Sequence, residues 1–432
     1  MTLEDLVQQL KTCPGIAQWQ VLESRAHRGE RYLTFLEAEC ERSVETCSWE
    51  VWLALPQRDG KHGEARFELD AAADAPVLAD RLEEALAHAA ATRLPAWHLP
   101  GPGSDGVART AVDVLAAEVS PWLSVDRACG EFVQACAAVP WVEAASCEMA
   151  FTHTARHLVN HHGLDLSDQQ QRLEAEYVLL HRDAAGIERE LYGAAEAVDA
   201  HALELVRRVT EAARDLREGA DPVPPPTGPR AVLLPECYFT ELLGYYVHHT
   251  DAATHVRGLN RLEPGEAVAV DPGAEAFDLH SDPRVSSTAA YGFDPNGYAP
   301  TRQTLIAAGR VQQLHGSAQW MQVLGRSPRG TAGTLVVKPG RQGVDQLRSE
   351  GVLEIVRFSE FGPRLDTGAF AGEIRLGWLH GPDGERRAVR GGSLTGSVAA
   401  AMAGVAFSRE SVAAGNYKGP RFALLGRADI AV

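Results

Sequence analysis

The stretch Asp221-Pro222-Val223-Pro224-Pro225-Pro226-Thr227-Gly228-Pro229 lies near the middle of a chain of 432 residues. It holds four prolines in five consecutive positions, 222–226. Each proline lacks a backbone N–H and fixes its own φ angle, so neither a helix nor a central strand continues through them. A chain of this length is also too long for one ordinary core. The sequence therefore predicts two domains, at residues 1–222 and 229–432.

Helical and strand-like patterns alternate on the N-terminal side of this junction. Apolar residues recur at helical spacing near the start of the chain, and alternating patterns typical of half-buried strands follow. We expect helices at 3–10, 75–92, 126–138 and 195–217, and strands at 17–24, 31–38, 49–55, 61–67, 141–159 and 171–182. The C-terminal side is Gly-rich and strand-like, with one short helix at 238–249. The predicted fold class is α+β, with an N-terminal mixed sheet with helices and a C-terminal largely antiparallel β domain.

The composition restricts the partners that the chain can have. A formal net charge of -17 argues against nucleic-acid and anionic-membrane partners, which require concentrated positive charge. The acidic start, Met1 to Leu6, is unlike a secretory signal, and no apolar run reaches the roughly 18 residues needed to span a bilayer. Seven cysteines without a CxxC pair fit neither a disulfide framework nor a zinc ribbon. We expect a reduced, cytoplasmic protein.

Several separated motifs beyond residue 229 share one order. They are Ala231–Pro235 with Phe239–Tyr245, His280–Arg284 with Phe293–Gly297, Thr301–Ile306, Leu335–Gly340, Phe370–Ile374 and Val389–Gly396. In this order they resemble the C-terminal domain of the TldD/PmbA family, also described as modulators of gyrase and as TldD-TldE metallopeptidase-like proteins. The N-terminal half has one corresponding turn, Asn160 to Gly163. The resemblance implies a TldD/PmbA-type fold and a role in peptide cleavage.

The zinc site that the resemblance implies is altered in this chain. Family members with a complete site carry HExxxH, whose two histidines bind zinc while the glutamate activates water, and a later cysteine completes the site. Here Thr240 and Tyr245 occupy the histidine positions, and only Glu241 remains. No cysteine follows Cys237, although the family places one near 415–419. A spacing of five puts the two positions about 140° apart on a regular helix, so a zinc-binding helix must loosen between them. These changes resemble the PmbA/TldE side of the family.

Other residues offer alternative metal ligands. On the predicted helix Cys237, Glu241, Tyr245 and either His248 or His249 fall on roughly one face, and His255 follows. The other interpretation makes Cys237 a core residue and the histidine pair a favourable charge at the helix end. A separate series, His153, His157 and His161, suits a metal only on a helix. On the strand predicted there, residues four apart lie about 13 Å from each other.

The sequence leaves three functions open. The first is the zinc-free, TldE-like subunit of a heterodimeric peptidase that acts on unfolded or short peptides, with no cofactor of its own and zinc in a TldD-like partner. The second is an enzyme with a remodelled site around Glu241, acting in peptide or natural-product maturation. The third is a non-catalytic homodimer that binds peptides. In the first, Glu241 is a remnant of the family motif, and activity exists only in the complex.

Overall fold

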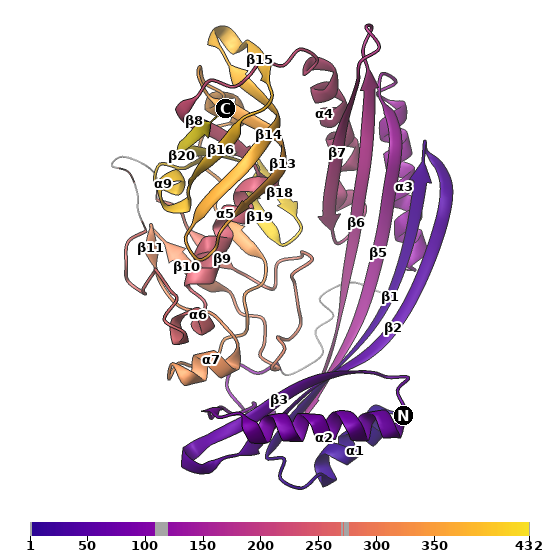
Figure 1. Ribbon diagram of the computed structural model, residues 1–432, viewed down its shortest axis with the longest axis vertical. Coiled ribbons are helices and arrows are strands. Elements are labelled where there is room, and N and C mark those ends of the chain that lie inside the picture. The colour runs from indigo at the N-terminus through magenta and orange to yellow at the C-terminus, as the bar shows by residue number, and fades with distance from the viewer. Residues whose placement is uncertain (1, 109–119, 269–270, 272–275, 432) are drawn as a thin grey trace.

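The computed structural model describes residues 2–108, 120–268, 271 and 276–431. One long, curved sheet forms most of the N-terminal part, and a compact group of shorter strands and helices forms the C-terminal part beside it (Figure 1). The α+β fold class predicted from the sequence is confirmed. The domain boundary at residues 222–229 stays a prediction.

The N-terminal sheet has seven strands in the order β4-β3-β2-β1-β5-β6-β7, and all their pairs are antiparallel. The strands are β1 (Gln18–Thr34), β2 (Glu37–Pro56), β3 (Lys61–Asp70), β4 (Leu94–Pro95), β5 (Glu143–Asn160), β6 (Asp165–Arg182) and β7 (Glu188–Ala197). This order leaves β7 at one edge of the sheet, on the side of the C-terminal part (Figure 1).

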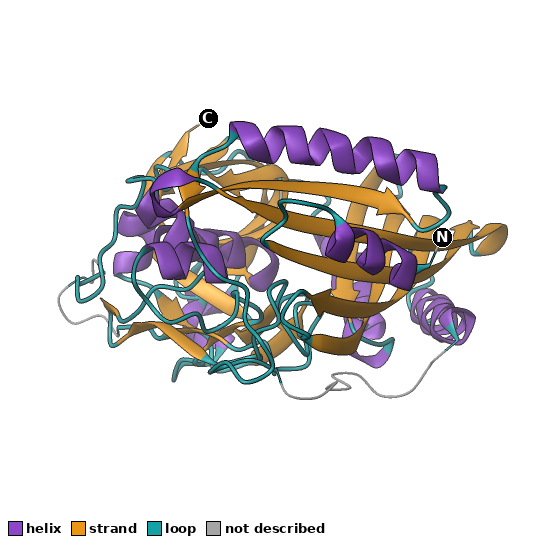
Figure 2. Ribbon diagram, turned by 90° about the horizontal axis from the view of Figure 1, so that it is seen from below, coloured by secondary structure: helices purple, strands orange, loops and turns teal. Residues whose placement is uncertain are grey.

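Four helices cover one face of this sheet in two groups. Helices α1 (Leu3–Thr12) and α2 (Ala75–Ala91) pack at one end on a cluster that includes Trp19, Trp49 and Val51. Figure 2 gives the view from below, where this helical end faces the reader. Helices α3 (Pro121–Ala137) and α4 (Leu205–Glu218) pack at the other end around Phe132 and Phe151. Alternate strand residues build both clusters, because side chains on a strand point to opposite faces in turn.

The C-terminal part is built from two sheets. Strands β13, β8, β20, β16 and β14 pair in sequence and close into a ring, since β13 also pairs with β14. A six-stranded sheet has the order β11-β10-β9-β12-β19-β18. The strands are β8 (Gly228–Pro235), β9 (Leu279–Ser281), β10 (Gln303–Ala307), β11 (Arg310–Val311), β12 (Leu335–Val337), β13 (Leu353–Pro363), β14 (Ala369–His380), β15 (Arg386–Val389), β16 (Ser393–Ser397), β17 (Ala406–Phe407), β18 (Ser411–Ala414), β19 (Tyr417–Pro420) and β20 (Phe422–Ala431). The helices are α5 (Glu236–His249), α6 (Ala252–Val256), α7 (Ala318–Val323), α8 (Val344–Leu347) and α9 (Val398–Ala403).

The motif Phe293–Gly297 joins the two parts of the molecule. Arg156 and Asp168, which form an ion pair on adjacent N-terminal strands, bind the backbone of this motif and of the residue before it. The Arg156 guanidinium donates to the Phe293 carbonyl at 2.9 Å, and Asp168 Oδ2 accepts the Gly292 N–H at 2.8 Å. Gln20 donates to the Pro295 carbonyl at 2.7 Å. The motif therefore docks the C-terminal part on the face of the sheet opposite the helices.

Two of the predicted segments are wrong in part. The strand expected at 31–38 is interrupted, because Phe35 and Leu36 form the turn between β1 and β2 with φ of 50° and 67°. The helix expected at 195–217 begins only at Leu205, since residues up to Ala197 pair with β6 as β7. The helix expected at 238–249 is present as α5. Within the described ranges, no helix is long and apolar enough to cross a membrane.

Candidate functional site

Helix α5 carries the altered motif, and its two sides differ. Phe239, Leu242, Leu243 and Tyr246 are buried in the C-terminal core, which holds the helix in place. Glu241, in contrast, is exposed. The helix is α-helical throughout 236–249. The loosening that a zinc-binding HExxxH helix requires is absent here, so positions 240 and 245 point about 140° apart.

Both positions that the family gives to zinc-binding histidines have other roles. The Thr240 hydroxyl donates to the Glu236 carbonyl at 2.7 Å, one helical turn back. Tyr245 is 6% exposed and lies edge-on to the ring of His249, with ring centroids 4.4 Å apart. Burial raises the pKa of the Tyr245 phenol above its ordinary value, so the phenol is neutral at physiological pH. A hydroxyl bound to the backbone and a buried neutral phenol do not suit zinc.

The hairpin of β18 and β19 occupies the region in which the family places its cysteine. Tyr417 begins β19, is 2% exposed, and packs edge-on against Phe239 of α5 at 5.6 Å between ring centroids. Its hydroxyl donates to the Pro420 carbonyl at 3.1 Å. The hairpin thus contacts the helix of the altered motif through an aromatic side chain.

The alternative ligands on α5 do not converge. No group of three or more His, Cys, Asp or Glu side chains that could hold a metal ion occurs in the described part of the chain. His249 is fully buried, and its Nδ1 accepts the Arg261 N–H at 3.2 Å. The His255 ring bonds to the His249 carbonyl at 3.0 Å. Cys237 is exposed, so the interpretation of this residue as part of the core is wrong.

The C-terminal end of α5 is capped by histidines other than the predicted pair. His255 bonds to the His249 carbonyl, and His315 bonds to the Val247 carbonyl at 2.8 Å. Burial lowers the pKa of His249 to about 4, so this ring is neutral and supplies no positive charge to the helix end. His315 lies far along the chain from α5, so the sequence does not indicate that it caps this helix.

Glu241 is the exposed residue of the altered motif, whereas Thr240 is half-buried and Tyr245 is buried. Its carboxylate is exposed and has no hydrogen-bond or ion-pair partner among the described residues. The surrounding protein removes part of its hydration and raises its pKa above the ordinary value of a glutamate. The side chain could therefore accept or donate a proton, or contact a bound molecule.

A groove of about 780 Å³ lies between the two parts of the molecule, beside the first turn of α5. Tyr238 of α5, Arg357 of β13 and Tyr192 of β7 all line it. The Arg357 guanidinium lies 5.1 Å from the centre of the Tyr192 ring and donates to the Tyr238 hydroxyl at 3.4 Å. The groove is therefore bridged by one arginine between two aromatic side chains.

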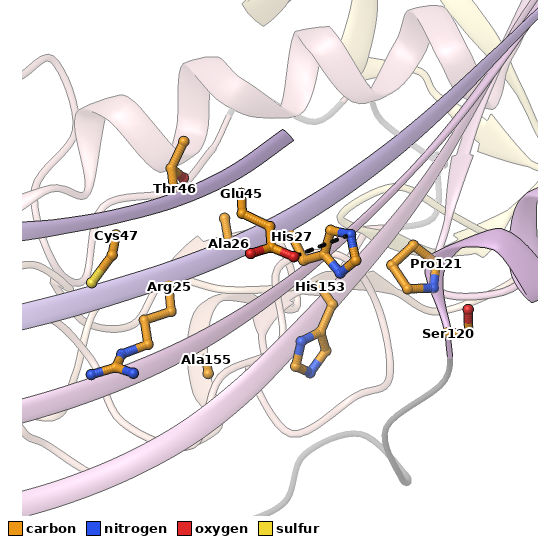
Figure 3. Close-up of a pocket in the computed structure, with 10 residues that line it drawn as sticks. All are labelled: Arg25, Ala26, His27, Glu45, Thr46, Cys47, Ser120, Pro121, His153 and Ala155. Atoms are coloured by element: carbon orange, nitrogen blue, oxygen red, sulfur yellow. Dashed lines mark ion pairs between the residues drawn. The ribbon is translucent and has the colours of Figure 1, made fainter. Parts of the chain in front are cut away.

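A second recess lies on the helical face of the N-terminal sheet, in the band between the two helix groups. Figure 3 shows Arg25, His27 and His153 projecting from its strands, with His27 3.9 Å from Glu45. His153 and His157 lie on strand β5, as predicted, and His161 follows in a turn. His153 bonds to Gln169 at 3.3 Å, and His157 pairs with Asp165 at 2.8 Å.

Comparisons with known proteins find a related family and similar folds. Residues 227–429 match the model of the family described as PmbA/TldA metallopeptidase C-terminal domain. The fold is similar to that of TldE from Thermococcus kodakarensis, with a TM-score of 0.81 and 17% identity over 100% of both chains. A structure from Thermotoga maritima, described as a candidate modulator of a DNA gyrase, gives the same TM-score, identity and coverage, namely 0.81, 17% and 100% of both chains.

A third structure, a candidate modulator of DNA gyrase from Bacteroides thetaiotaomicron, has a TM-score of 0.77 and 14% identity over 99% of this chain and 97% of that one. A comparison with curated proteins found no match. At these identities the solved structures establish the fold, and the family model adds the sequence relationship of the C-terminal part.

Proposed function

The chain belongs to the TldD/PmbA family, and we propose that it is the TldE-like subunit, without a zinc site of its own, of a heterodimeric peptidase. The peptidase acts on unfolded or short peptides, and a TldD-like partner supplies the zinc. The observation that carries this proposal is that neither Thr240 nor Tyr245 can bind zinc. The Thr240 hydroxyl is bound to the helix backbone, and Tyr245 is a buried neutral phenol.

The donor set around α5 does not fit zinc. Catalytic zinc sites use three protein ligands, drawn from histidine, carboxylate and thiolate, and leave one position open. The motif offers only the Glu241 carboxylate, and Tyr417 packs on the helix in the hairpin where the family has its cysteine. Zinc chemistry in the complex therefore requires ligands from another chain.

The chain's own contribution in this proposal is to hold the peptide. Strand β7 is at the edge of its sheet and borders the groove that contains Tyr238. An extended peptide that pairs with this edge gains main-chain hydrogen bonds whatever its side chains are. This mode suits a peptidase subunit that accepts unfolded segments of varied sequence.

Co-expression with a homologue that carries an intact HExxxH and a late cysteine tests the proposal. We expect the two chains to co-purify as one complex of equal stoichiometry that cleaves an unfolded peptide, while this chain alone is inactive. Size-exclusion chromatography with light scattering measures the complex, and mass spectrometry of the products measures cleavage. If no complex forms, or if this chain alone cleaves peptides, the proposal is wrong.

The exposed Glu241 supports a second candidate, an enzyme with a remodelled site. A carboxyl group with a raised pKa and no partner suits general acid or base chemistry. This candidate predicts that the chain alone modifies or cleaves peptides and loses that activity in Glu241→Gln. A third candidate, the non-catalytic homodimer, predicts saturable peptide binding with neither metal nor a different partner chain.

A further inference from the structure

The groove follows the edge of β7 rather than one of its faces. Consecutive residues of the strand, 188–192, all line it, although their side chains point alternately to opposite faces of the sheet. On the outer edge, the Glu196 carbonyl already accepts the Gly415 N–H at 2.9 Å. In an antiparallel strand every second residue directs its N–H and C=O to the same side. The main-chain groups of Glu190, Tyr192 and Ala194 therefore also point outward.

Those outward groups have no partner within the described residues, because β7 ends its sheet and no strand follows it. Free strand edges are templates for pairing, and proteins normally block them. Here the edge is bordered by the second wall of the groove, which comes from the C-terminal ring. An extended segment is thus the shape of ligand that this edge accepts.

Three arginines without a carboxylate partner line the second wall of the groove. Arg357 lies on β13, Arg375 on β14, and Arg390 directly after β15. Strand β14 pairs with both β13 and β15, and all three arginines line the same groove. None of them lies within ion-pair distance of a carboxylate in the described chain, whereas Arg189, the fourth arginine that lines the groove, pairs with Asp183 at 2.9 Å.

The carboxylates that line the groove do not pair with these three arginines. Glu188 pairs with Arg182 at 2.7 Å, and Asp215 accepts the Trp378 indole N–H at 3.2 Å. Glu190 and Glu360 are exposed, and neither forms an ion pair with the three arginines. Arg357 is held by Tyr192 and the Tyr238 hydroxyl, so its orientation is fixed before any ligand arrives.

We infer that this groove selects extended peptides that carry a carboxylate, which Arg357, Arg375 and Arg390 bind while the peptide backbone pairs with β7. Guanidinium groups bind carboxylates through two parallel N–H···O bonds, and such bonds are stronger than neutral ones. The carboxylate belongs either to an acidic side chain or to the peptide's C-terminus. The inference rests on the proposed role in handling peptides and adds a chemical preference to it.

Fluorescence anisotropy on the full-length chain tests this preference with three labelled short peptides of equal length. The first contains glutamates and has an amidated C-terminus. The second replaces each glutamate by glutamine and stays amidated, and the third is the glutamine peptide with a free C-terminal carboxylate. We expect the first or third peptide to bind at least about tenfold more tightly than the second, with an advantage that falls at high salt.

Arginine substitutions test which residues bind the carboxylate. Arg375→Gln with Arg390→Gln should remove the advantage of the carboxylate peptide, because these exposed arginines have no structural partner to lose. Arg387→Gln is the matched control, since Arg387 is exposed on β15 and lies outside the groove. The advantage of the first peptide over the third identifies acidic side chains as the recognised groups, and the reverse identifies the C-terminus.

Equal binding of all three peptides would overturn the inference and leave the proposed function standing. The inference would also be overturned if the carboxylate peptide still bound more tightly to the double variant Arg375→Gln, Arg390→Gln. The same holds if its tighter binding disappeared in Arg387→Gln. Failure of every peptide to bind, either to the chain alone or to the complex with its partner, would overturn the inference together with the proposed role in peptide handling.

Discussion

Tyr245 lies so close to Gly368 that a Cβ on this glycine would be 2.9 Å from Cε2 of the tyrosine ring. Gly368 also has a φ of 75°, a conformation that favours glycine. The loop before β14 therefore closes over the position that holds a zinc-binding histidine in complete family members. A buried phenol fills this place, which makes the altered motif part of the packed structure.

This contact predicts that Gly368→Ala is more destabilising than a glycine replacement that strains the backbone alone. Gly384 is the control, because it has a φ of 80° and nothing within 4 Å of its Cβ position. We expect Gly384→Ala to cost about 1 kcal/mol and Gly368→Ala about 1 to 3 kcal/mol more in the free energy of unfolding, measured by urea denaturation. Equal costs would show that Tyr245 does not press on Gly368.

The buried Asp215 predicts a stability change on acidification. Burial raises its pKa from 3.8 to about 6, so the folded protein holds the proton more tightly than the unfolded chain. The group therefore opposes folding above pH 6, and this penalty disappears as the pH falls through about 6 towards 3.8. Asp215→Asn, which can still accept the Trp378 N–H, should raise the free energy of unfolding at pH 8 by up to about 3 kcal/mol.

The same substitution should change little at pH 4, where the carboxyl is protonated in the folded state. Urea denaturation across this pH range measures both values. A variant that is equally stabilised at pH 8 and pH 4 would contradict the raised pKa of Asp215.

The pair of Arg156 and Asp168 predicts a large loss of stability when one member is removed. The Asp168 side chain is 0% exposed, and that of Arg156 is 13% exposed. Asp168→Asn should cost about 3 to 5 kcal/mol, because it leaves a buried guanidinium without its charge partner. Asp165→Asn is the control, since the Asp165 side chain is 72% exposed in its pair with His157. We expect it to cost less than about 1 kcal/mol.

Thermal denaturation followed by circular dichroism and by limited proteolysis checks this prediction. Asp168→Asn should loosen the contact between the N-terminal sheet and the motif at 293–297, so proteolysis should begin near that motif. Similar stability of the two variants would mean that the pair does not hold the two parts together.

Glu241→Gln separates the subunit function from the remodelled enzyme. If this chain is the zinc-free subunit, the peptidase activity of the complex should change less than about threefold, because the partner carries out the chemistry. The chain with Thr240→Val is the matched control, since this change removes a hydroxyl that bonds only to the helix backbone. Loss of activity on the order of a hundredfold in Glu241→Gln alone would instead favour general acid or base catalysis by this residue.

Much of the fold could be predicted because local pattern and tertiary structure agree. Helix α2 and strand β3 follow from their apolar periodicity. Strand β7 could not be predicted in this way, because its alanines at 194, 195 and 197 favour a helix locally and only pairing with β6 makes it a strand. The turn at Phe35 and Leu36 also lacks the glycine or asparagine that usually marks a hairpin.

The candidate site could also be predicted only in part from the sequence. The altered positions Thr240 and Tyr245 are visible in the sequence because the motif is contiguous on one helix. The capping of α5 by His315 and the bridge from Arg357 to Tyr192 join segments far apart in the chain, and a single sequence carries no sign of such contacts. The free edge of β7 follows from the order of the strands in the sheet, which local patterns do not determine.

Metal content is the most direct test of the central claim that this chain is the zinc-free half of a pair. Inductively coupled plasma mass spectrometry should be applied to the chain purified alone and to the complex with an intact-motif homologue. We predict no stoichiometric metal in the chain alone and about one zinc per pair in the complex. Stoichiometric zinc in the chain alone would contradict the account, and His248, His249 and His255 would then be the first ligands to replace.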